Sequence, residues 1–329
     1  MRTLIVGPSW IGDAVISHAL ILRLKELRPD AAIDVLAPAW ALAVYRRMPE
    51  VGRTIAAPFG HGDLKLGERR AFARSLGAYE RAIVLPNSWK SALVPWHARI
   101  PTRTGYRGEM RYGLLNDLRT LDAEALPRLV ERYCALAQPA GEALARPVPQ
   151  PRLRVDPASA AATLAKHGLA TDRPAAAFAP GAEYGPAKRW PARHFAAAAR
   201  TLAARGWQVW LLGSAKDAQA TREIRALAGD ACVDLAGRTS LDEAIDLLAS
   251  AARVLTNDSG LMHVAAALDR PTAAIFGSSS PAFTPPLSAK ARVVSLHLDC
   301  SPCFKRVCPL GHTNCLEKLE PGTVLQALD

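Results

Sequence analysis

The sequence predicts an α/β protein made of two doubly wound domains, each built on a parallel β-sheet. Short apolar runs alternate along the chain with stretches of helical spacing, which is the pattern of strand–helix–strand units. The alternation occurs in two series, separated at 141–157 by a proline-rich segment. The chain has 329 residues, 50% of them hydrophobic, which suits two cores of about 150 residues each. We therefore expect one domain at 1–160 and a second at 161–329.

The first series opens with an apolar strand, a glycine turn and a helix. Strands are expected at 3–6, 33–36 and 82–85, and a helix from Asp13 to about Leu27. The turn reads "GPSWIGDAVIS" and lacks the three-glycine pattern of dinucleotide-binding loops. Asp13 follows the second glycine, Gly12, where a carboxylate would repel a pyrophosphate. The loop therefore argues against a nicotinamide-dependent dehydrogenase.

The second series repeats the alternation with shorter connections. Strands are expected at 175–179, 208–212, 233–235, 253–256 and 272–276, and helices at 191–204, 218–228, 240–251 and 259–268. Ser240 and Glu243 have the spacing of a capping box. Ligands of parallel sheets bind beyond the carboxyl ends of the strands, so the loops that follow these strands are the candidate site.

Two of these loops carry residues suited to an anionic ligand. In "PGAEYGPAKRWP" (180–191), Lys188 comes just before a helix, where its charge would neutralise phosphate oxygens. In "NDSGLMHVAAAL" (257–268), Asp258 or Ser259 can cap a helix, Gly260 permits close approach, and His263 lies one turn after Ser259. A surface lysine and an ordinary capped helix with a core histidine stay open as alternatives.

The charge is basic and unevenly distributed. The net charge of the chain is +11. Residues 1–165 hold 23 Lys and Arg against 15 Asp and Glu, so +8 of this charge lies in the first half. This excess favours an anionic partner, although an arginine-rich solvated surface would give the same count. The sequence contains no run of about 18 apolar residues and no signal-peptide pattern, so we expect a cytoplasmic protein.

Two segments of the first half are rich in basic residues. The first, 60–75, is interrupted by glycines, and in the second, 85–113, tryptophan and tyrosine occur among the basic residues. The candidate anion-binding residues there are Lys65, Arg69, Arg70, Arg103, Arg107 and Arg111. Aromatic rings among guanidinium groups suit sugars and phosphates. They equally suit single-stranded nucleic acid, which is the competing interpretation.

Five motifs in order resemble those of the bacterial heptosyltransferases of glycosyltransferase family nine, and among these the type II enzymes. They are "GPSWIGDAVIS" (7–17), "PNSWKSALVPW" (86–96), "RTGYRGEMRYGLLND" (103–117), "PGAEYGPAKRWP" (180–191) and "NDSGLMHVAAAL" (257–268). The resemblance covers residues 1 to about 293. It implies a GT-B fold, in which two Rossmann-like domains face a central cleft and the last helix can pack back on the first domain.

The resemblance also implies an activity and its partners. The enzyme would be an inverting transferase that moves heptose from ADP-L-glycero-β-D-manno-heptose to the first heptose of the lipopolysaccharide inner core. The acceptor would be lipid A–Kdo–heptose at the cytoplasmic face of the inner membrane, with peripheral membrane contact, no nucleic acid and no catalytic cofactor or metal. A type I or III enzyme acting on another core acceptor stays open, as does a non-catalytic basic nucleotide- or nucleic-acid-binding protein.

The same resemblance assigns roles to individual residues. Asp13 matches the family's general base, and a carboxylate can take the proton of a sugar hydroxyl as the new bond forms; the ordinary alternative is that Asp13 caps the first helix. Lys188 matches the lysine that contacts the donor diphosphate and stabilises the leaving ADP. The donor-binding set is Gly12, Lys188, Asp258, Ser259, Gly260 and His263, and the acceptor-binding set is Lys65, Arg69, Arg70, Arg103, Arg107 and Arg111.

A cysteine-rich segment near the C-terminus falls outside this resemblance. The stretch "CSPCFKRVCPLGHTNC" places Cys300, Cys303, Cys308 and Cys315 in the spacing C-x2-C-x4-C-x6-C. This spacing is compact enough for a structural zinc ion or an iron–sulfur cluster. Free or reversibly oxidised thiols are the alternative, and a stable disulfide framework is disfavoured in a reducing compartment.

Overall fold

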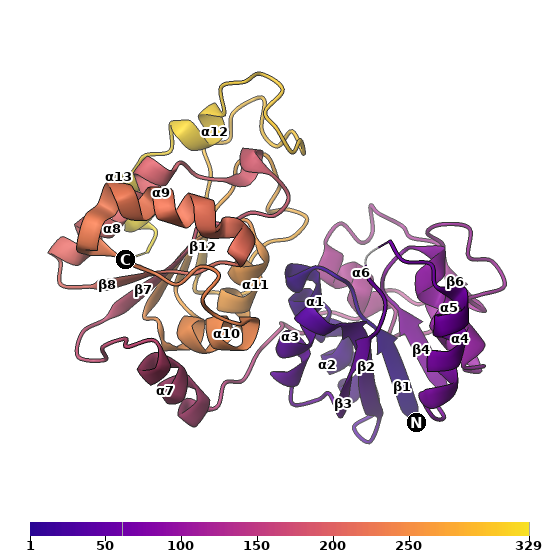
Figure 1. Ribbon diagram of the computed structural model, residues 1–329. Coiled ribbons are helices and arrows are strands. Elements are labelled where there is room, and N and C mark those ends of the chain that lie inside the picture. The colour runs from indigo at the N-terminus through magenta and orange to yellow at the C-terminus, as the bar shows by residue number, and fades with distance from the viewer. Residues whose placement is uncertain (61, 329) are drawn as a thin grey trace. The chain divides into compact units, whose positions relative to one another are not determined.

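The computed structural model describes residues 1–60 and 62–328, and the chain forms two compact units, Met1–Pro151 and Arg152–Asp329 (Figure 1). The division falls within the proline-rich segment, nine residues before the boundary at 160 that the sequence suggested. Each unit contains one six-stranded parallel sheet with helices packed on it. The predicted α/β class with two doubly wound parallel sheets is therefore confirmed.

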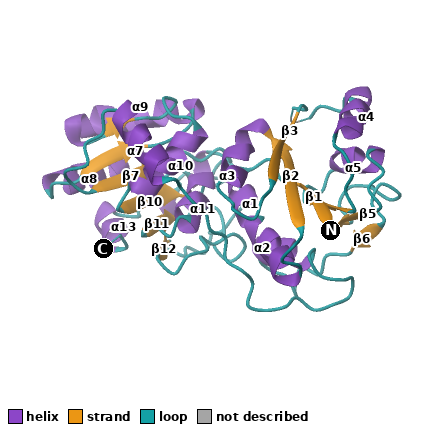
Figure 2. Cartoon of the chain, turned by 90° about the horizontal axis from the view of Figure 1, so that it is seen from below, coloured by secondary structure: helices purple, strands orange, loops and turns teal. Residues whose placement is uncertain are grey.

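The first unit has the sheet order β3-β2-β1-β4-β5-β6. Its strands are β1 Arg2–Val6, β2 Ala32–Pro38, β3 Arg53–Ala57, β4 Arg81–Val84, β5 Thr102–Tyr106 and β6 Asp117–Arg119. Its helices are α1 Ile11–Ile16, α2 His18–Leu27, α3 Leu42–Arg46, α4 Leu66–Ser75, α5 Leu93–His97 and α6 Leu129–Ala135. Helices α4 and α5 pack together, as do α1, α2, α3 and α6. Figure 2 shows α4 and α5 on one side of the sheet and α1, α2 and α3 on the other.

The helix expected at 13–27 is interrupted at Ser17. The Ser17 hydroxyl is buried and donates a hydrogen bond to the Ala14 carbonyl over 2.7 Å, which is a backbone-directed bond of the kind that bends helices. The chain therefore forms α1 and α2 in place of one continuous helix.

The second unit has the sheet order β12-β11-β10-β7-β8-β9. Its strands are β7 Ala175–Ala179, β8 Gln208–Leu211, β9 Val233–Asp234, β10 Arg253–Asn257, β11 Thr272–Ile275 and β12 Ala291–Val294. Its helices are α7 Pro157–Lys166, α8 Ala192–Ala204, α9 Ala218–Ala228, α10 Leu241–Ser250, α11 Gly260–Ala267, α12 Asn314–Glu317 and α13 Pro321–Gln326. Short 3₁₀ turns are η1 Ala39–Ala41 and η2 Trp89–Ala92 in the first unit, and η3 Pro186–Lys188, η4 Ala215–Asp217 and η5 Gly229–Ala231 in the second.

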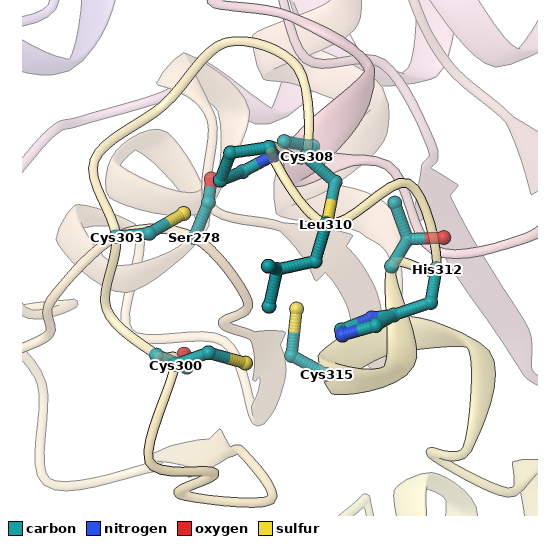
Figure 3. A pocket seen from close by; sticks show the side chains of 11 residues that line it. Ser278, Cys300, Cys303, Cys308, Leu310, His312 and Cys315 are labelled. Carbon is teal, nitrogen blue, oxygen red and sulfur yellow. The ribbon is translucent and has the colours of Figure 1, made fainter.

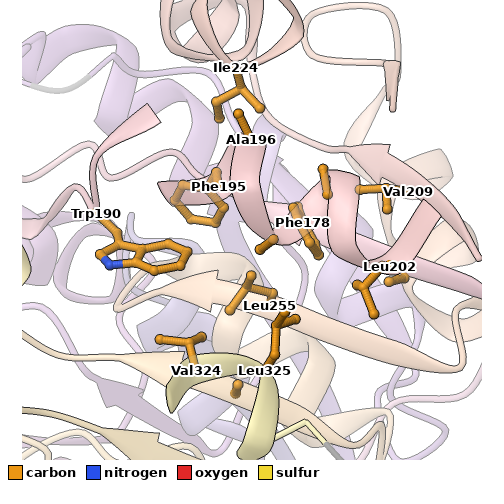
Figure 4. Packing of buried hydrophobic residues seen from close by; sticks show 14 of the residues in the cluster. Phe178, Trp190, Phe195, Ala196, Leu202, Val209, Ile224, Leu255, Val324 and Leu325 are labelled. Carbon is orange, nitrogen blue, oxygen red and sulfur yellow. The ribbon is translucent and has the colours of Figure 1, made fainter. Parts of the chain in front are cut away.

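The core of the second unit joins residues from both ends of its sequence. Phe178 of β7, Phe195 of α8 and Leu255 of β10 pack in one buried cluster with Val324 and Leu325 of α13 (Figure 4). The last helix therefore packs on α8 and β11 of its own unit.

The capping box expected at the start of α10 is confirmed. The Ser240 hydroxyl accepts from the Glu243 N–H, and the Glu243 carboxylate accepts from the Ser240 N–H. In the two described ranges, no helix is both long enough and apolar enough to cross a bilayer.

Candidate functional site

The loops at the carboxyl ends of β7, β10 and β11 bring three polar side chains together. Lys188, in η3, donates a hydrogen bond to the Asp258 carboxylate, with Nζ 2.5 Å from Oδ2. The Ser279 hydroxyl lies 2.5 Å from the same oxygen and donates to it. The Lys188 side chain is 17% exposed and that of Asp258 is 6% exposed. Two predicted donor residues thus form one largely buried ion pair, and Asp258 bonds to Lys188 and Ser279 instead of capping α11.

Asn257 fixes the shape of the Lys188 loop, a role that the sequence analysis missed. Its side chain is fully buried, and its Nδ2 donates to the Pro180 carbonyl over 2.6 Å. Its Oδ1 accepts from the Trp190 N–H over 3.1 Å. One amide therefore binds both ends of the loop that carries Lys188. Its position directly before Asp258 was visible in the sequence, but its two backbone partners were not.

The helix α11 begins beside this ion pair. Ser259 is its N-cap residue, Gly260 its first helical residue, and Asp258, which binds Lys188, directly precedes the cap. The first N–H groups of a helix have no partner within the helix. A helix N-terminus and a lysine both favour an anion such as a phosphate. The donor site that the sequence analysis expects at this place stays a prediction.

His263 lies on the same helix, 7% exposed. Burial lowers the pKa of His263 to about 4, the Asp258 carboxylate opposes this shift, and the Lys188 ammonium adds to it. The imidazole is therefore neutral near pH 7, where it can take part in hydrogen bonds but carries no charge.

In the first unit, Gly12 and Asp13 lie in the first turn of α1. Gly12 is buried, whereas Asp13 is only partly buried. Two phenols are close enough to sense the Asp13 charge: burial first, and then Asp13, raise the pKa of Tyr45 and of Tyr133. A carboxylate at the edge of such a low-dielectric region suits a group that must take up a proton.

The turn before α1 approaches Tyr45 closely. A Cβ added to Gly7 would lie 2.6 Å from the Tyr45 hydroxyl oxygen, so a larger residue at this position would displace the ring. The same hydroxyl lies 3.2 Å from the Ser17 hydroxyl at the junction of α1 and α2. These contacts fix the turn that positions Asp13.

Three of the six expected acceptor-binding residues point into the protein, which corrects the prediction for them. Arg111 is fully buried and donates to the carbonyls of Pro86 and Tyr106, and burial lowers its pKa to about 10. Arg69 donates to the Asp63 and Leu64 carbonyls, and Arg103 to those of Ile100 and Leu114. Their guanidinium groups hold loops together, and a phosphate could reach them only if those loops opened.

The other three residues have exposed side chains. Lys65 lies 3.4 Å from Glu68 and 3.8 Å from Asp63, in partly exposed ion pairs, while Arg70 and Arg107 are exposed. These three remain candidates for contact with an anionic acceptor.

The four cysteines of the C-terminal segment line one small cavity. Cys300, Cys303, Cys308 and Cys315 surround it together with His312, and Figure 3 shows their sulfur atoms around this space. All four are free thiols. Across residues 1–60 and 62–328, no three His, Cys, Asp or Glu side chains are already arranged as a metal-ligand set.

Paired doubly wound sheets, with a lysine and a helix N-terminus at the carboxyl ends of the second sheet, are typical of GT-B glycosyltransferases. The family model for glycosyltransferase family 9 (heptosyltransferase) matches residues 69–314. The chain belongs to glycosyltransferase family 9, so it is a transferase, and the family resemblance read from the five motifs is confirmed.

Individual relatives agree with this assignment over the full chain. The chain is 49% identical over 340 residues to lipopolysaccharide heptosyltransferase 2 of Escherichia coli (strain K12), covering 100% of this chain and 98% of the relative. It is 48% identical over 310 residues to lipooligosaccharide heptosyltransferase 2 of Haemophilus influenzae, covering 90% and 89%. The solved structure of E. coli ADP-heptose lps heptosyltransferase II has a TM-score of 0.90, 48% identity, and coverage of 100% and 97%.

Proposed function

We propose that this chain is an inverting glycosyltransferase of the heptosyltransferase II type, which moves heptose from ADP-heptose to the first heptose of the lipopolysaccharide inner core. The observation that carries the proposal is the full-length identity of 49% to a lipopolysaccharide heptosyltransferase 2. The pairing of Lys188 with Asp258 beside the start of α11 supports it, since this is an anion site at the carboxyl ends of parallel strands.

The donor site as proposed uses the charges of the second unit. The Lys188 ammonium and the N–H groups at the start of α11 bind the diphosphate and stabilise the charge that develops on ADP as it leaves. Asp258 keeps the ammonium in place and, together with Ser259 and the neutral His263, accepts or donates hydrogen bonds to sugar hydroxyls. Gly260 allows the ligand to approach the backbone, and Gly12 leaves room beside the base.

The transfer step as proposed uses Asp13 of the first unit. Its carboxylate takes the proton of the acceptor hydroxyl while the hydroxyl oxygen attacks the anomeric carbon of heptose. The bond between this carbon and the diphosphate oxygen breaks, ADP leaves with the electron pair, and the configuration at the carbon inverts. We assign the four cysteines no contact with the reacting groups, and the transfer step needs no bound cofactor.

The acceptor side is proposed from charge and exposure. Lys65, Arg70 and Arg107 are exposed cations of the basic first unit and would contact the phosphates of lipid A–Kdo–heptose. Because this acceptor is anchored in lipid, we propose that the protein works at the cytoplasmic face of the inner membrane through peripheral contact.

A panel of acceptors with no, one or two heptoses, each incubated with ADP-heptose, tests the function. We expect turnover to peak on the one-heptose acceptor. A peak on the acceptor without heptose would indicate a type I enzyme, and a peak on the two-heptose acceptor would indicate a type III enzyme. No transfer to any acceptor, with ADP still bound, would support the alternative of a non-catalytic nucleotide-binding protein.

Replacement of the base tests the mechanism. Asp13→Asn should lower kcat by about 10²- to 10⁴-fold and leave ADP affinity unchanged, because ADP binds in the other unit. The matched control is Asp30→Asn, which neutralises an exposed carboxylate of the same unit and should keep normal turnover. Near-normal turnover of Asp13→Asn would overturn the assignment of the base.

A further inference from the structure

Four cysteines separated by up to 15 residues converge on one cavity of the second unit. Cys300, Cys303, Cys308 and Cys315 all line it, and its volume of about 20 Å³ is enough for one water-sized occupant such as a metal ion. The other two cysteines of the chain, Cys134 and Cys232, lie buried elsewhere in the fold. Chance placement of four of six cysteines around one small cavity is a poor explanation for this arrangement.

The segment that carries these cysteines has little other means of holding its shape. Residues 295–313, all of which the structure describes, form neither helix nor strand. The apolar side chains of Phe304, Val307 and Leu310 are 57%, 66% and 61% exposed, so the segment buries little hydrophobic surface. Irregular segments of this kind are commonly held by a structural metal ion.

His312 also lines the cavity, but a backbone group already occupies one of its ring nitrogens. Its Nδ1 accepts a hydrogen bond from the Asn314 N–H over 3.0 Å. The four free thiols are therefore the candidate ligands.

We propose that Cys300, Cys303, Cys308 and Cys315 bind one thiophilic metal ion, zinc or iron, in a tetrahedral site. Four thiolates satisfy the coordination number of either ion, and sulfur ligands select both over magnesium or calcium. The sulfurs surround the cavity (Figure 3). The proposal requires their side chains to turn toward the ion as it binds.

The ion also fixes the loop that carries Lys188, a consequence that rests on the proposed function. Ala187, the neighbour of Lys188, lines the same cavity and donates its N–H to the Arg306 carbonyl over 3.1 Å. The Tyr184 hydroxyl donates to the Phe304 carbonyl over 2.8 Å, and a Cβ on Gly185 would lie 2.5 Å from the Arg306 carbonyl oxygen. The cysteine segment therefore forms one wall of the Lys188 loop, and an ion that orders the segment orders the loop.

Metal content of the full-length protein tests the site directly. Protein purified anaerobically without chelators should contain about one zinc or iron ion per chain by elemental analysis, which also tells the two ions apart. Cys308→Ser and Cys315→Ser should each lower this to less than about 0.2 ion, whereas Cys232→Ala should keep about one. Cobalt(II) added to protein stripped of metal should give the strong visible absorption of a tetrahedral thiolate site.

Two results would overturn the proposal. One is less than about 0.2 ion per chain, with all six thiols titratable and no cobalt spectrum. The other is a disulfide between two of the four cysteines in the anaerobic protein.

Binding of ADP tests the link to Lys188. Removal of the ion should weaken ADP binding by about 10-fold, as measured by calorimetry, and return of the ion should restore it. Unchanged ADP affinity with the ion removed would overturn this link and leave the metal site intact. If the metal-loaded protein failed to bind ADP at all, the proposed function would fail, and the metal count would be unaffected.

Discussion

We predict that the ion pair between Lys188 and Asp258 makes two separable contributions, one to stability and, under the proposed function, one to donor binding. In Lys188→Met, the 6% exposed Asp258 carboxylate keeps the Ser279 hydroxyl but loses its positive partner. Two unit charges about 4 Å apart attract each other by about 4 kcal/mol at an effective dielectric constant of about 20. Removing one partner of a buried ion pair lowers the free energy of unfolding by about 3–5 kcal/mol. We expect a loss of about 3 kcal/mol, because Lys188 is 17% exposed and water can partly take the place of its ammonium group.

In Lys188→Met the donor site of the proposed function also loses the positive charge that would face the diphosphate. A charge-assisted hydrogen bond contributes about 2 kcal/mol, so ADP should bind Lys188→Met roughly 30-fold more weakly. In the double variant Lys188→Met/Asp258→Asn the orphaned carboxylate is gone. We therefore expect it to regain about 2 kcal/mol of unfolding free energy, while the ADP affinity stays low.

Denaturant unfolding and calorimetric titration with ADP measure the two contributions on the same samples. The matched control is Lys290→Met, because Lys290 pairs with Asp269 at the same 2.5 Å but both partners are more than half exposed. Its unfolding free energy should change by less than about 1 kcal/mol, and its ADP affinity should not change. Unchanged ADP affinity of Lys188→Met would refute the phosphate contact, and a double variant no more stable than Lys188→Met would refute the buried pair.

Three further predictions concern a buried imidazole, a buried guanidinium and the last helix. In the unfolded chain His263 takes up a proton below about pH 6.5, whereas in the folded protein it does so only near pH 4. The contribution of the neutral imidazole to the free energy of unfolding is therefore complete above about pH 6.5 and is lost as the pH falls toward 4. The unfolding free energy, measured from pH 7 to 4, should therefore fall by roughly 3 kcal/mol more in the parent protein than in His263→Gln. If it fell equally with pH in both proteins, a buried neutral imidazole would be contradicted. Arg111→Lys should lower the unfolding free energy by about 2–4 kcal/mol, because an ammonium cannot reach both the Pro86 and the Tyr106 carbonyls. An unchanged denaturation midpoint would show that Arg111 does not hold these two loops together. Leu325→Ala should cost about 2–4 kcal/mol in the same assay, and a loss below about 0.5 kcal/mol would show that α13 is not part of the core.

Most inner strands of both sheets and the helices α8 to α11 were predicted from the sequence, whereas the inner strand β5 and three of the four edge strands were not. The strands β1, β7 and β10 lie in the middle of their sheets and read as apolar runs because both of their faces are covered. The edge strands β3, β6 and β12 escaped prediction, since half or more of each is exposed or only partly buried, and their residues follow no apolar pattern. The break at Ser17 also escaped prediction, because it depends on a hydrogen bond that the apolar spacing does not encode.

The candidate site divides in the same way. Lys188 and Asp258 were singled out because glycines and prolines mark their loops, and the structure brings them together. Asn257 was not singled out, since its role depends on carbonyl and N–H groups of residues 67 and 77 positions away. With the arginines the opposite happened: the sequence analysis singled out Arg111 for ligand binding, but its guanidinium group is buried. Arg111 and the exposed Arg107 lie in one basic segment, and nothing in that segment distinguishes the buried guanidinium from the exposed one.

The sequence by itself determined the alternation of inner strands with helices, the family, and the residue types available for the proposed donor binding and proton transfer. These properties follow from the spacing of neighbouring residues, because apolar periodicity and turn residues act over a few positions. Only the tertiary structure decided which cations are free, which carboxylate holds Lys188, and that the four cysteines share a cavity with its loop. Burial and hydrogen bonding depend on groups far apart in the chain, and they alone determine whether a charged side chain faces a ligand or a backbone carbonyl.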